Sequence, residues 1–169
     1  MATPQHPHTA VYPGTFDPLT MGHVSLVHRA LKVFDRVIVA VAKETPKQPV
    51  FTLEERTEMI REVFITEPRV EVESFQGLLV DYVHNRGVNV ILRGMRAVSD
   101  FDHEFQMAIM NRRLNKNIES VFLMTDFKWL YISSTIIREL ARVGGNIEGL
   151  VPVEVLRRLE DRFNQKLGT

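Results

Sequence analysis

Hydrophobic and polar positions follow two periods along this chain, one typical of strands and the other of helices. Strand patterns are short apolar or β-branched runs, or runs in which polar and apolar residues alternate. They lie at residues 9–12, 36–42, 69–75, 88–92 and 119–124. Between them are helix patterns: Val27, Ala30, Leu31 and Phe34, for example, recur at the spacing of one buried helix face. Five strands alternating with helices are therefore predicted.

Boundary signals place the helices. Thr52 with Glu55 three residues later forms a capping box, and Gly87 and Gly144 follow helix patterns as C-terminal stop signals. The first predicted helix has His23 in its first turn, and the second follows Thr52. Three more are predicted at residues 79–85, 99–114 and 133–143, of which the second is opened by Ser99 with Asp102. The last helix has Pro152 in its first turn, and its apolar stripe is Leu156, Leu159 and Phe163.

Alternating strands and helices imply right-handed crossovers and a parallel sheet covered on both faces. We therefore expect an α/β fold, a doubly wound five-stranded parallel sheet. In a 3-2-1-4-5 strand order, the first and fourth strands flank the point at which the order reverses, and ligands bind there beyond the carboxyl ends of the strands. The loops after strands are thus where chemistry is expected.

Length and composition narrow the function classes. The 169 residues suit one domain, expected at residues 9–169 after a mobile tail at residues 1–8. No run approaches the ~20 apolar residues of a membrane span, and the N-terminus lacks the pattern of a signal peptide, so we expect a cytoplasmic protein without membrane contact. The absence of cysteine excludes disulfides and thiolate catalysis. Scattered histidines give no zinc-site spacing, and no nucleophile elbow is present.

The charge balance argues against one class of partner and leaves another open. Lys plus Arg and Asp plus Glu are both 21, so the net charge is zero and a long nucleic acid is not the expected partner. Most of the cations are arginine, whose planar fork suits phosphate groups. Small phosphorylated ligands therefore remain plausible.

The loop after the first strand, residues 12–23, places small residues and His23 at a helix start, where free N–H groups can bind a phosphate. The alternative is a plain turn in which Asp17 or Thr20 caps the helix. The loop after the fourth strand carries Arg93 and Arg96 around a glycine, and topology predicts that it converges with the first loop. Each arginine could instead pair with a surface carboxylate.

Other candidates have simpler alternatives. After the fifth strand, Ser133, Ser134 and Thr135 either cap a helix or hold an anion together with it, and Trp129 either packs or borders a ring site. Lys47 follows the second strand and Leu79 the third; a solvated lysine and an ordinary core leucine are the alternatives. Glu104 could accept from a ribose or an amine, although most helix glutamates are only solvated.

Four motifs, in this order and spacing, resemble those of bacterial phosphopantetheine adenylyltransferases, a family within the nucleotidylyltransferase superfamily. They are Tyr12-Pro13-Gly14-Thr15-Phe16-Asp17-Pro18 with Thr20-Met21-Gly22-His23, Phe51-Thr52-Leu53-Glu54-Glu55-Arg56, Arg93-Gly94-Met95-Arg96 and Ile132-Ser133-Ser134-Thr135. The resemblance covers about residues 9–160. Two positions depart from the usual family sequence. Family members usually carry asparagine at the position of Met21 and often carry tyrosine at the position of His103.

The resemblance implies a Rossmann-like fold, a homohexamer, magnesium-dependent transfer of AMP from ATP to 4'-phosphopantetheine, and feedback by coenzyme A. It also implies roles for individual residues. His23 would stabilise the transition state, and Mg²⁺ would bind mainly through the ATP phosphates. ATP would contact Thr15, Phe16, His23, Gly94, Met95, Arg96, Glu104, Trp129, Leu130, Tyr131, Ile132, Ser133, Ser134 and Thr135. Phosphopantetheine would contact Thr15, Lys47, Leu79 and Arg93.

Three rival functions stay open at this point. One is another nucleotidylyltransferase, acting on nicotinamide mononucleotide or glycerol phosphate. A second is a non-catalytic adenine-nucleotide sensor, although the glycine-rich phosphate loop of that group is missing. A fragment of a class I aminoacyl-tRNA synthetase is the third, and zero net charge with no room for an RNA-binding domain argues against it.

Overall fold

The computed structural model describes residues 8–44 and 48–168, and its centre is a five-stranded parallel sheet in the order β3-β2-β1-β4-β5. The strands are β1 (Thr9–Gly14), β2 (Arg36–Ala42), β3 (Val70–Phe75), β4 (Val90–Met95) and β5 (Glu119–Met124). The helices are α1 (Met21–Ala30), α2 (Leu53–Val63), α3 (Leu79–Asn85), α4 (Val98–Leu114), the short 3-10 helix η1 (Phe127–Trp129), α5 (Ser134–Arg142) and α6 (Val153–Phe163). The expected strand order and α/β class are confirmed.

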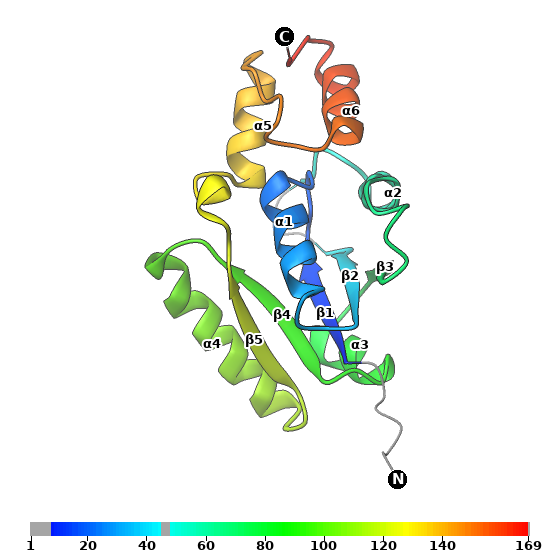
Figure 1. Cartoon of the computed structure of the whole chain (residues 1–169), viewed down its shortest axis with the longest axis vertical. Coiled ribbons are helices and arrows are strands. Elements are labelled where there is room, and N and C mark those ends of the chain that lie inside the picture. Colours follow the sequence, from blue (N-terminus) through cyan, green and yellow to red (C-terminus); the bar gives the residue numbers. More distant parts are fainter. Residues whose placement is uncertain (1–7, 45–47, 169) are drawn as a thin grey trace.

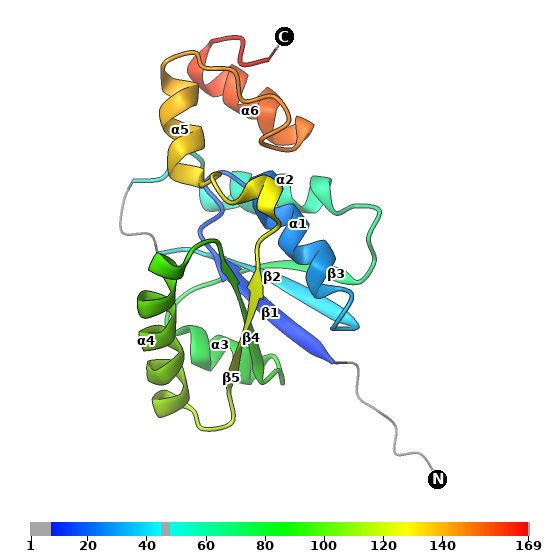
Figure 2. The same cartoon turned by 60° about the vertical axis from the view of Figure 1, so that its left-hand side comes forward.

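Alternate residues of the strands serve two separate cores. Ala10 and Tyr12 of β1 belong to the larger core, with α1, α2, α5 and α6, whereas Val11 between them belongs to the smaller one, with α3. β2 divides in the same way, because Val39 faces the first core and Ala40 the second. This division is the period of two expected for a sheet covered on both faces, and it explains the unbroken apolar runs. Figure 2 shows α1 and α2 on one side of the sheet and α3 and α4 on the other.

Helices α5 and α6 form a pair beyond the carboxyl edge of the sheet, at the top of Figure 1. The buried side chains of Ile137 on α5 and of Val155 and Leu159 on α6 attach this pair to the larger core. The pair therefore closes the molecule at the edge where ligands of such sheets bind. No helix of the described ranges is long and apolar enough to cross a membrane.

Several boundaries differ from the sequence prediction. The fourth strand does not end at Leu92: it continues to Met95, because residues 93–95 pair with residues 122–124 of β5. Helix α4 begins at Val98 after Ala97 and has no side-chain cap, so the predicted start at Ser99 with Asp102 is wrong. Helix η1 was not predicted.

Other local predictions are confirmed. The Thr52–Glu55 capping box is present: the Glu55 N–H donates to Thr52 Oγ1 (3.2 Å) and the Thr52 N–H to Glu55 Oε2 (2.8 Å). The first helix ends at Ala30, earlier than its apolar pattern suggests, yet Leu31 and Phe34 in the following turn are buried as predicted. The last helix is present, but Pro152 is its N-cap residue and not part of its first turn, because α6 begins at Val153.

Candidate active site

The loop after β1, the end of β4 and the start of α5 meet around one cavity of about 400 Å³. Its lining comprises Tyr12, Pro13, Gly14, Thr15, Phe16, Thr20, Gly22, His23, Arg93, Gly94, Arg96, Thr125, Trp129, Ile132, Ser133 and Ser134. We call this cavity the crevice. Strands β1 and β4 are neighbours in the sheet, so the predicted convergence of the first loop with the arginine segment is confirmed.

An aromatic cluster forms the β1 side of the crevice. The Phe16 ring meets the Tyr12 ring edge-on at a centroid distance of 5.3 Å and the His23 ring at 5.2 Å. Gly14 lets Phe16 lie there, because a Cβ at Gly14 would come within 2.8 Å of the Phe16 ring. Burial raises the pKa of the Tyr12 hydroxyl, which therefore stays protonated at neutral pH.

His23 is held in one orientation by Thr20, the N-cap residue of α1. The Thr20 main-chain N–H donates to His23 Nδ1 at 3.0 Å, and the His23 N–H donates to Thr20 Oγ1 at 3.4 Å. Because Nδ1 is an acceptor, Nε2 carries the ring proton. Burial, together with the nearby Arg96 charge, lowers the pKa of His23 to about 4. His23 is therefore a neutral hydrogen-bond donor at the start of α1.

Arg93 of β4 and Arg96, which directly follows this strand, both have carboxylate partners while they line the crevice. Arg93 makes a two-point pair with Glu104 of α4, with Nε–Oε2 2.6 Å and Nη2–Oε1 2.7 Å. Arg96 Nε lies 3.4 Å from Asp100 Oδ2, and its Nη1 donates to the Ile132 carbonyl at 3.3 Å. Both are thus oriented cations at the crevice wall. Between them, Gly94 allows close packing on α1, because a Cβ would come within 2.9 Å of Leu26 Cδ2.

The three hydroxyl residues before and in α5 divide their roles. Ser133 caps the helix by accepting the Ile136 N–H at 3.2 Å, while Ser134 Oγ donates to the Pro18 carbonyl at 2.8 Å. Thr135 Oγ1 accepts from Arg138 Nη2 at 3.2 Å. Ser133 and Ser134 line the crevice, so the start of α5 faces it.

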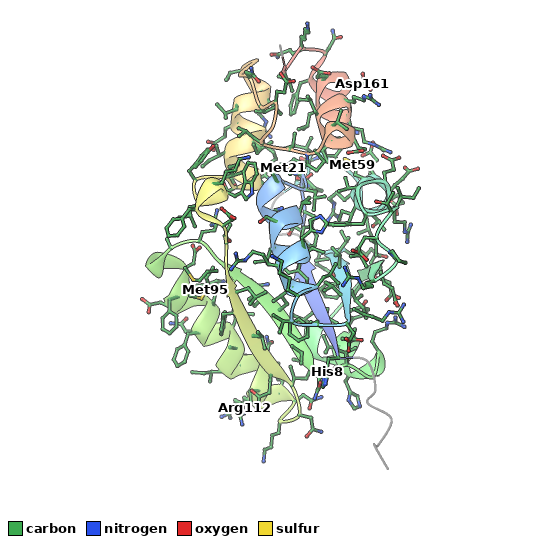
Figure 3. The ribbon with its side chains drawn as sticks, in the orientation of Figure 1. His8, Met21, Met59, Met95, Arg112 and Asp161 are labelled. Atoms are coloured by element: carbon green, nitrogen blue, oxygen red, sulfur yellow. The ribbon has the colours of Figure 1, made fainter. Side chains whose placement is uncertain are left out.

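Some predicted site residues lie elsewhere. Met95 ends β4 and is marked in Figure 3; Leu130, Tyr131 and Thr135 are likewise outside the crevice lining, and the Tyr131 residue is 65% exposed. Leu79 and Glu104 line a second, smaller cavity, which Arg93 shares with the crevice. The remaining lining of this second cavity is His103, Met107, Ala108, Asn111 and Ser120. Lys47 lies outside the described residues.

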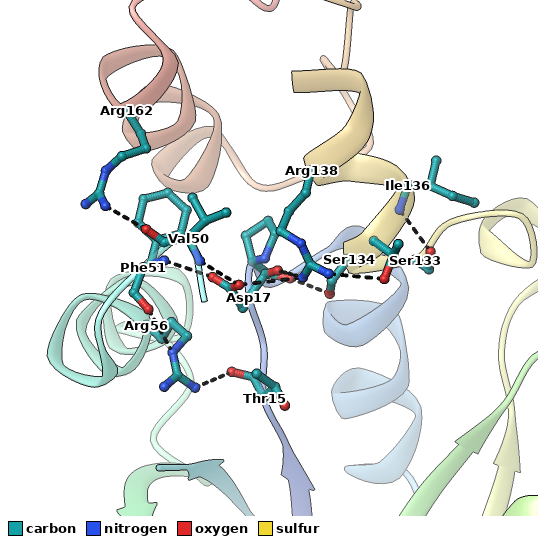
Figure 4. Close-up of polar contacts among 12 residues, drawn as sticks. Thr15, Asp17, Val50, Phe51, Arg56, Ser133, Ser134, Ile136, Arg138 and Arg162 are labelled. Carbon is teal, nitrogen blue, oxygen red and sulfur yellow. Dashed lines mark hydrogen bonds and ion pairs between the residues drawn. The ribbon is translucent and has the colours of Figure 1, made fainter. Parts of the chain in front are cut away.

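Sequence reasoning missed Thr125 and the part that Asp17, Arg56 and Arg138 have in holding the first loop. Thr125 lines the crevice directly after β5, and the rule that ligands bind beyond carboxyl strand ends could have identified it. Arg56 and Arg138 stand behind the first loop and donate to its main-chain carbonyls at Thr15 and Asp17, whereas Asp17 lies in the loop and its carboxylate binds the main chain at residues 50 and 51 (Figure 4). Thr20, and not Asp17, caps α1. Arg56 binds main-chain carbonyls, and the Asp17 carboxylate binds two main-chain N–H groups besides its ion pair with Arg138 at 3.6 Å, so most of these partners are main-chain groups that carry no sequence signal.

Comparison with known proteins agrees with this architecture. Residues 11–140 match the family model described as cytidylyltransferase-like. Over 154 residues the chain is 63% identical to the phosphopantetheine adenylyltransferase of Nitratidesulfovibrio vulgaris (strain DP4), covering 91% of this chain and 83% of the relative. The phosphopantetheine adenylyltransferase of Solidesulfovibrio magneticus is 61% identical over 160 residues, or 95% and 93% of the two chains. The phosphopantetheine adenylyltransferase of Anaeromyxobacter sp. (strain K) is 52% identical over 159 residues, or 94% of each chain.

These likenesses extend over nearly the whole chain and include all the elements that build the crevice. The chain belongs to the phosphopantetheine adenylyltransferase family, a family of nucleotidyltransferases.

Proposed function

We propose that this protein transfers the adenylyl group of ATP to 4'-phosphopantetheine, giving dephospho-coenzyme A and pyrophosphate. The observation that carries the proposal is the crevice itself, in which a neutral histidine donor, two arginines and two helix starts meet at the switch point of the sheet. Such a set of donors suits the phosphate groups of a nucleotide. The names of the relatives supply the acceptor.

The reaction needs no protein nucleophile. An oxygen of the acceptor phosphate, already anionic at neutral pH, attacks the α-phosphorus of ATP; the new P–O bond forms as the bond to the β-phosphate breaks, and pyrophosphate leaves with the electron pair. No proton must move, so no general base is required. The obstacle is the charge that accumulates around the α-phosphorus, and fixed donors that meet this charge lower the barrier.

Each crevice residue has a part in this scheme. The Nε2–H group of His23 donates a hydrogen bond to an oxygen on the α-phosphorus, and Arg96 offsets the charge of the nucleotide phosphates. Thr15 and Phe16 contact ATP with their loop, and Thr15 also contacts the acceptor phosphate. Gly94 of β4, Trp129 and Ile132, and the start of α5 would border the nucleotide. Met95, outside the crevice lining, is assigned to ATP by resemblance alone. Leu130, Tyr131 and Thr135, outside the crevice lining, are assigned to ATP by resemblance alone.

Arg93 separates the two ligands in this proposal. It lines both the crevice and the second cavity, and Leu79 lines the second cavity too. The acceptor phosphate would therefore bind at Arg93, with the start of its uncharged arm toward Leu79. Glu104 forms a two-point pair with Arg93 and does not line the crevice, so it would act on the ligands by orienting that guanidinium. Lys47 is expected to bind the acceptor by resemblance alone.

Magnesium would be held through the substrate. The described residues contain no group of three or more His, Cys, Asp or Glu side chains arranged to hold a metal ion. Mg²⁺ commonly keeps several waters and binds through substrate phosphates with few protein ligands, so an ATP-borne ion fits this crevice. When bound, it would neutralise phosphate charge. We place the reaction in the cytoplasm and retain coenzyme A as a feedback ligand.

The expected homohexamer has a suitable surface on α4. Large apolar side chains on this helix are 43–53% exposed in the single chain: Phe101, Phe105, Met107, Ile109, Met110 and Leu114. Exposed apolar surface of this extent on one helix is typical of association surfaces. We infer that α4 contacts other copies of the chain. Ile109→Glu should lower the mass measured by light scattering, whereas Val33→Glu, at another exposed apolar position, should leave it unchanged.

One assay tests the main proposal. The protein is incubated with ATP, 4'-phosphopantetheine and Mg²⁺, and pyrophosphate and dephospho-coenzyme A are measured, with nicotinamide mononucleotide and glycerol phosphate as competing acceptors. Of the three acceptors, only 4'-phosphopantetheine is expected to be adenylylated. Turnover with another acceptor would indicate the rival transferase, and ATP binding without any turnover would indicate the nucleotide sensor.

A further inference from the structure

The backbone of the first loop is strained at the point where it meets the crevice. Phe16 has a φ of 49°, in the left-handed region that residues other than glycine rarely adopt. Its side chain is nevertheless 3% exposed and packed against Tyr12 and His23. Such a conformation persists only where surrounding contacts hold it, and it is concentrated at functional sites.

Arg56 of α2 holds the residue before Phe16. It is 1% exposed, and its Nη1 donates to the Thr15 carbonyl at 2.7 Å and to the Ala42 carbonyl at 2.9 Å. Its Nε donates to the Phe51 carbonyl at 3.2 Å. One buried guanidinium thus joins the first loop, the end of β2 and the segment before α2. Figure 4 shows Arg56 with its partners Thr15 and Phe51.

Asp17, the residue after Phe16, is itself held by contacts with the segment before α2 and with Arg138 of α5. It is 3% exposed, and its carboxylate accepts the main-chain N–H groups of Val50 at 2.9 Å and Phe51 at 3.0 Å. Its own carbonyl accepts from Arg138 of α5. Figure 4 shows Asp17 between Val50 and Phe51 on one side and Arg138 on the other, with Arg56 below Phe51. Phe16 is therefore flanked by two buried charged side chains that fix its neighbours.

We propose that Arg56 and Asp17 are positioning residues that hold the strained Thr15–Phe16 peptide in the orientation required to bind ATP phosphate. A peptide is planar and trans, so a Thr15 carbonyl directed at Arg56 turns the Phe16 N–H to the opposite side. Thr15 and Phe16 both line the crevice, and this fixed N–H is the donor offered to a phosphate oxygen. The inference rests on the proposed function only for the identity of the ligand.

The side-chain types suit this role. A guanidinium presents several donors in a rigid plane and can bind three carbonyls in different directions, whereas an ammonium is a compact point charge. A carboxylate has two acceptor oxygens, one for each N–H of Val50 and Phe51. An asparagine at position 17 has only one, and its amide would oppose the second N–H. Arg56→Lys and Asp17→Asn therefore change the geometry with little change in size.

The test compares kinetics with stability. Arg56→Met, Arg56→Lys and Asp17→Asn are purified, their thermal unfolding is recorded, and kcat and KM for each substrate are measured well below the unfolding temperature. Arg61→Met is the matched control, because Arg61 lies on the same helix and donates to Val72 of β3, away from the loop. Val155→Ala, a buried truncation on α6, controls for lost stability. ATP binding without acceptor is measured by calorimetry.

The three loop variants are expected to lose at least ~10-fold in kcat/KM for ATP, on the scale that a small misplacement of reacting groups produces. Arg61→Met and Val155→Ala should stay within about twofold of the parent at the same temperature. If Arg56→Met does not fold, Arg56→Lys and Asp17→Asn provide the same test. Parental kcat, KM and ATP affinity in folded loop variants would overturn the proposal. A parent that binds ATP without adenylyl transfer would refute the proposed function, while the calorimetry would still test the positioning role.

Discussion

Removal of the His23 ring should change how the stability of this protein responds to acid. The ring is held neutral because Thr20 donates to Nδ1 and because burial and Arg96 disfavour a second proton. In the unfolded chain the pKa returns to about 6.5. The unfolded state therefore binds a proton as the pH falls through 6.5, and the folded state does so only near its own pKa of about 4. Stability present above pH 6.5 is lost progressively toward pH 4.

The size of this effect follows from the two pKa values. Between pH 7 and pH 4.5, a pKa of about 4 in the folded state and 6.5 in the unfolded state corresponds to a loss of ~2 kcal/mol from this one group. The ring lines the crevice and keeps some contact with solvent, so this is an upper value. His23→Asn removes the ionisable group and can still place an oxygen near the position of Nδ1. Its free energy of unfolding should therefore fall less over the same pH interval.

The measurement is urea unfolding of parent and variant at pH 7 and pH 4.5, with the difference of the two pH-dependent losses as the result. His28→Asn, on the exposed side of the same helix, is the matched histidine control. The expected difference for His23→Asn is between ~1 and ~2 kcal/mol, with the larger loss in the parent. Equal losses in parent and His23→Asn would show that the fold does not hold His23 neutral, and its role as a neutral donor would have to be abandoned.

Three further predictions concern the crevice. His23→Ala should lower kcat by ~100-fold or more with little change in ATP affinity, as for the loss of one preorganised donor; equal losses in both would make His23 a ground-state binding residue. Arg93→Ala should weaken acceptor binding and Arg96→Ala nucleotide binding, each by ~1.5 to 3 kcal/mol in calorimetry, and normal binding of both ligands by both variants would contradict the site. Gly14→Ala should lower the unfolding free energy by ~1 to 3 kcal/mol, because its methyl group would overlap the Phe16 ring; an unchanged denaturation midpoint would show that the ring can move away.

The sequence by itself determined the class and order of the elements. Five strands appear in it as apolar or alternating runs, and the central ones are apolar at successive positions, as in β2, because a parallel sheet covered on both faces buries both sides of its central strands. The Thr52–Glu55 cap is local chemistry between residues three apart and was therefore readable. Chain order alone also predicted that the loop after β1 and the end of β4 share one crevice.

The tertiary structure decided what depends on partners distant in sequence. The fourth strand extends to Met95 because β5 pairs with it, and that pairing involves residues about 30 positions away along the chain. Arg93 pairs with Glu104 of α4 and lines both the crevice and the second cavity, and no sequence motif indicates this arrangement. Arg56 binds main-chain carbonyls, and Asp17 binds main-chain N–H groups in addition to its ion pair with Arg138; every residue offers the same carbonyl and nearly every one the same N–H. A side chain that recognises backbone leaves no complementary residue type in the sequence, so only the folded chain identifies its partner.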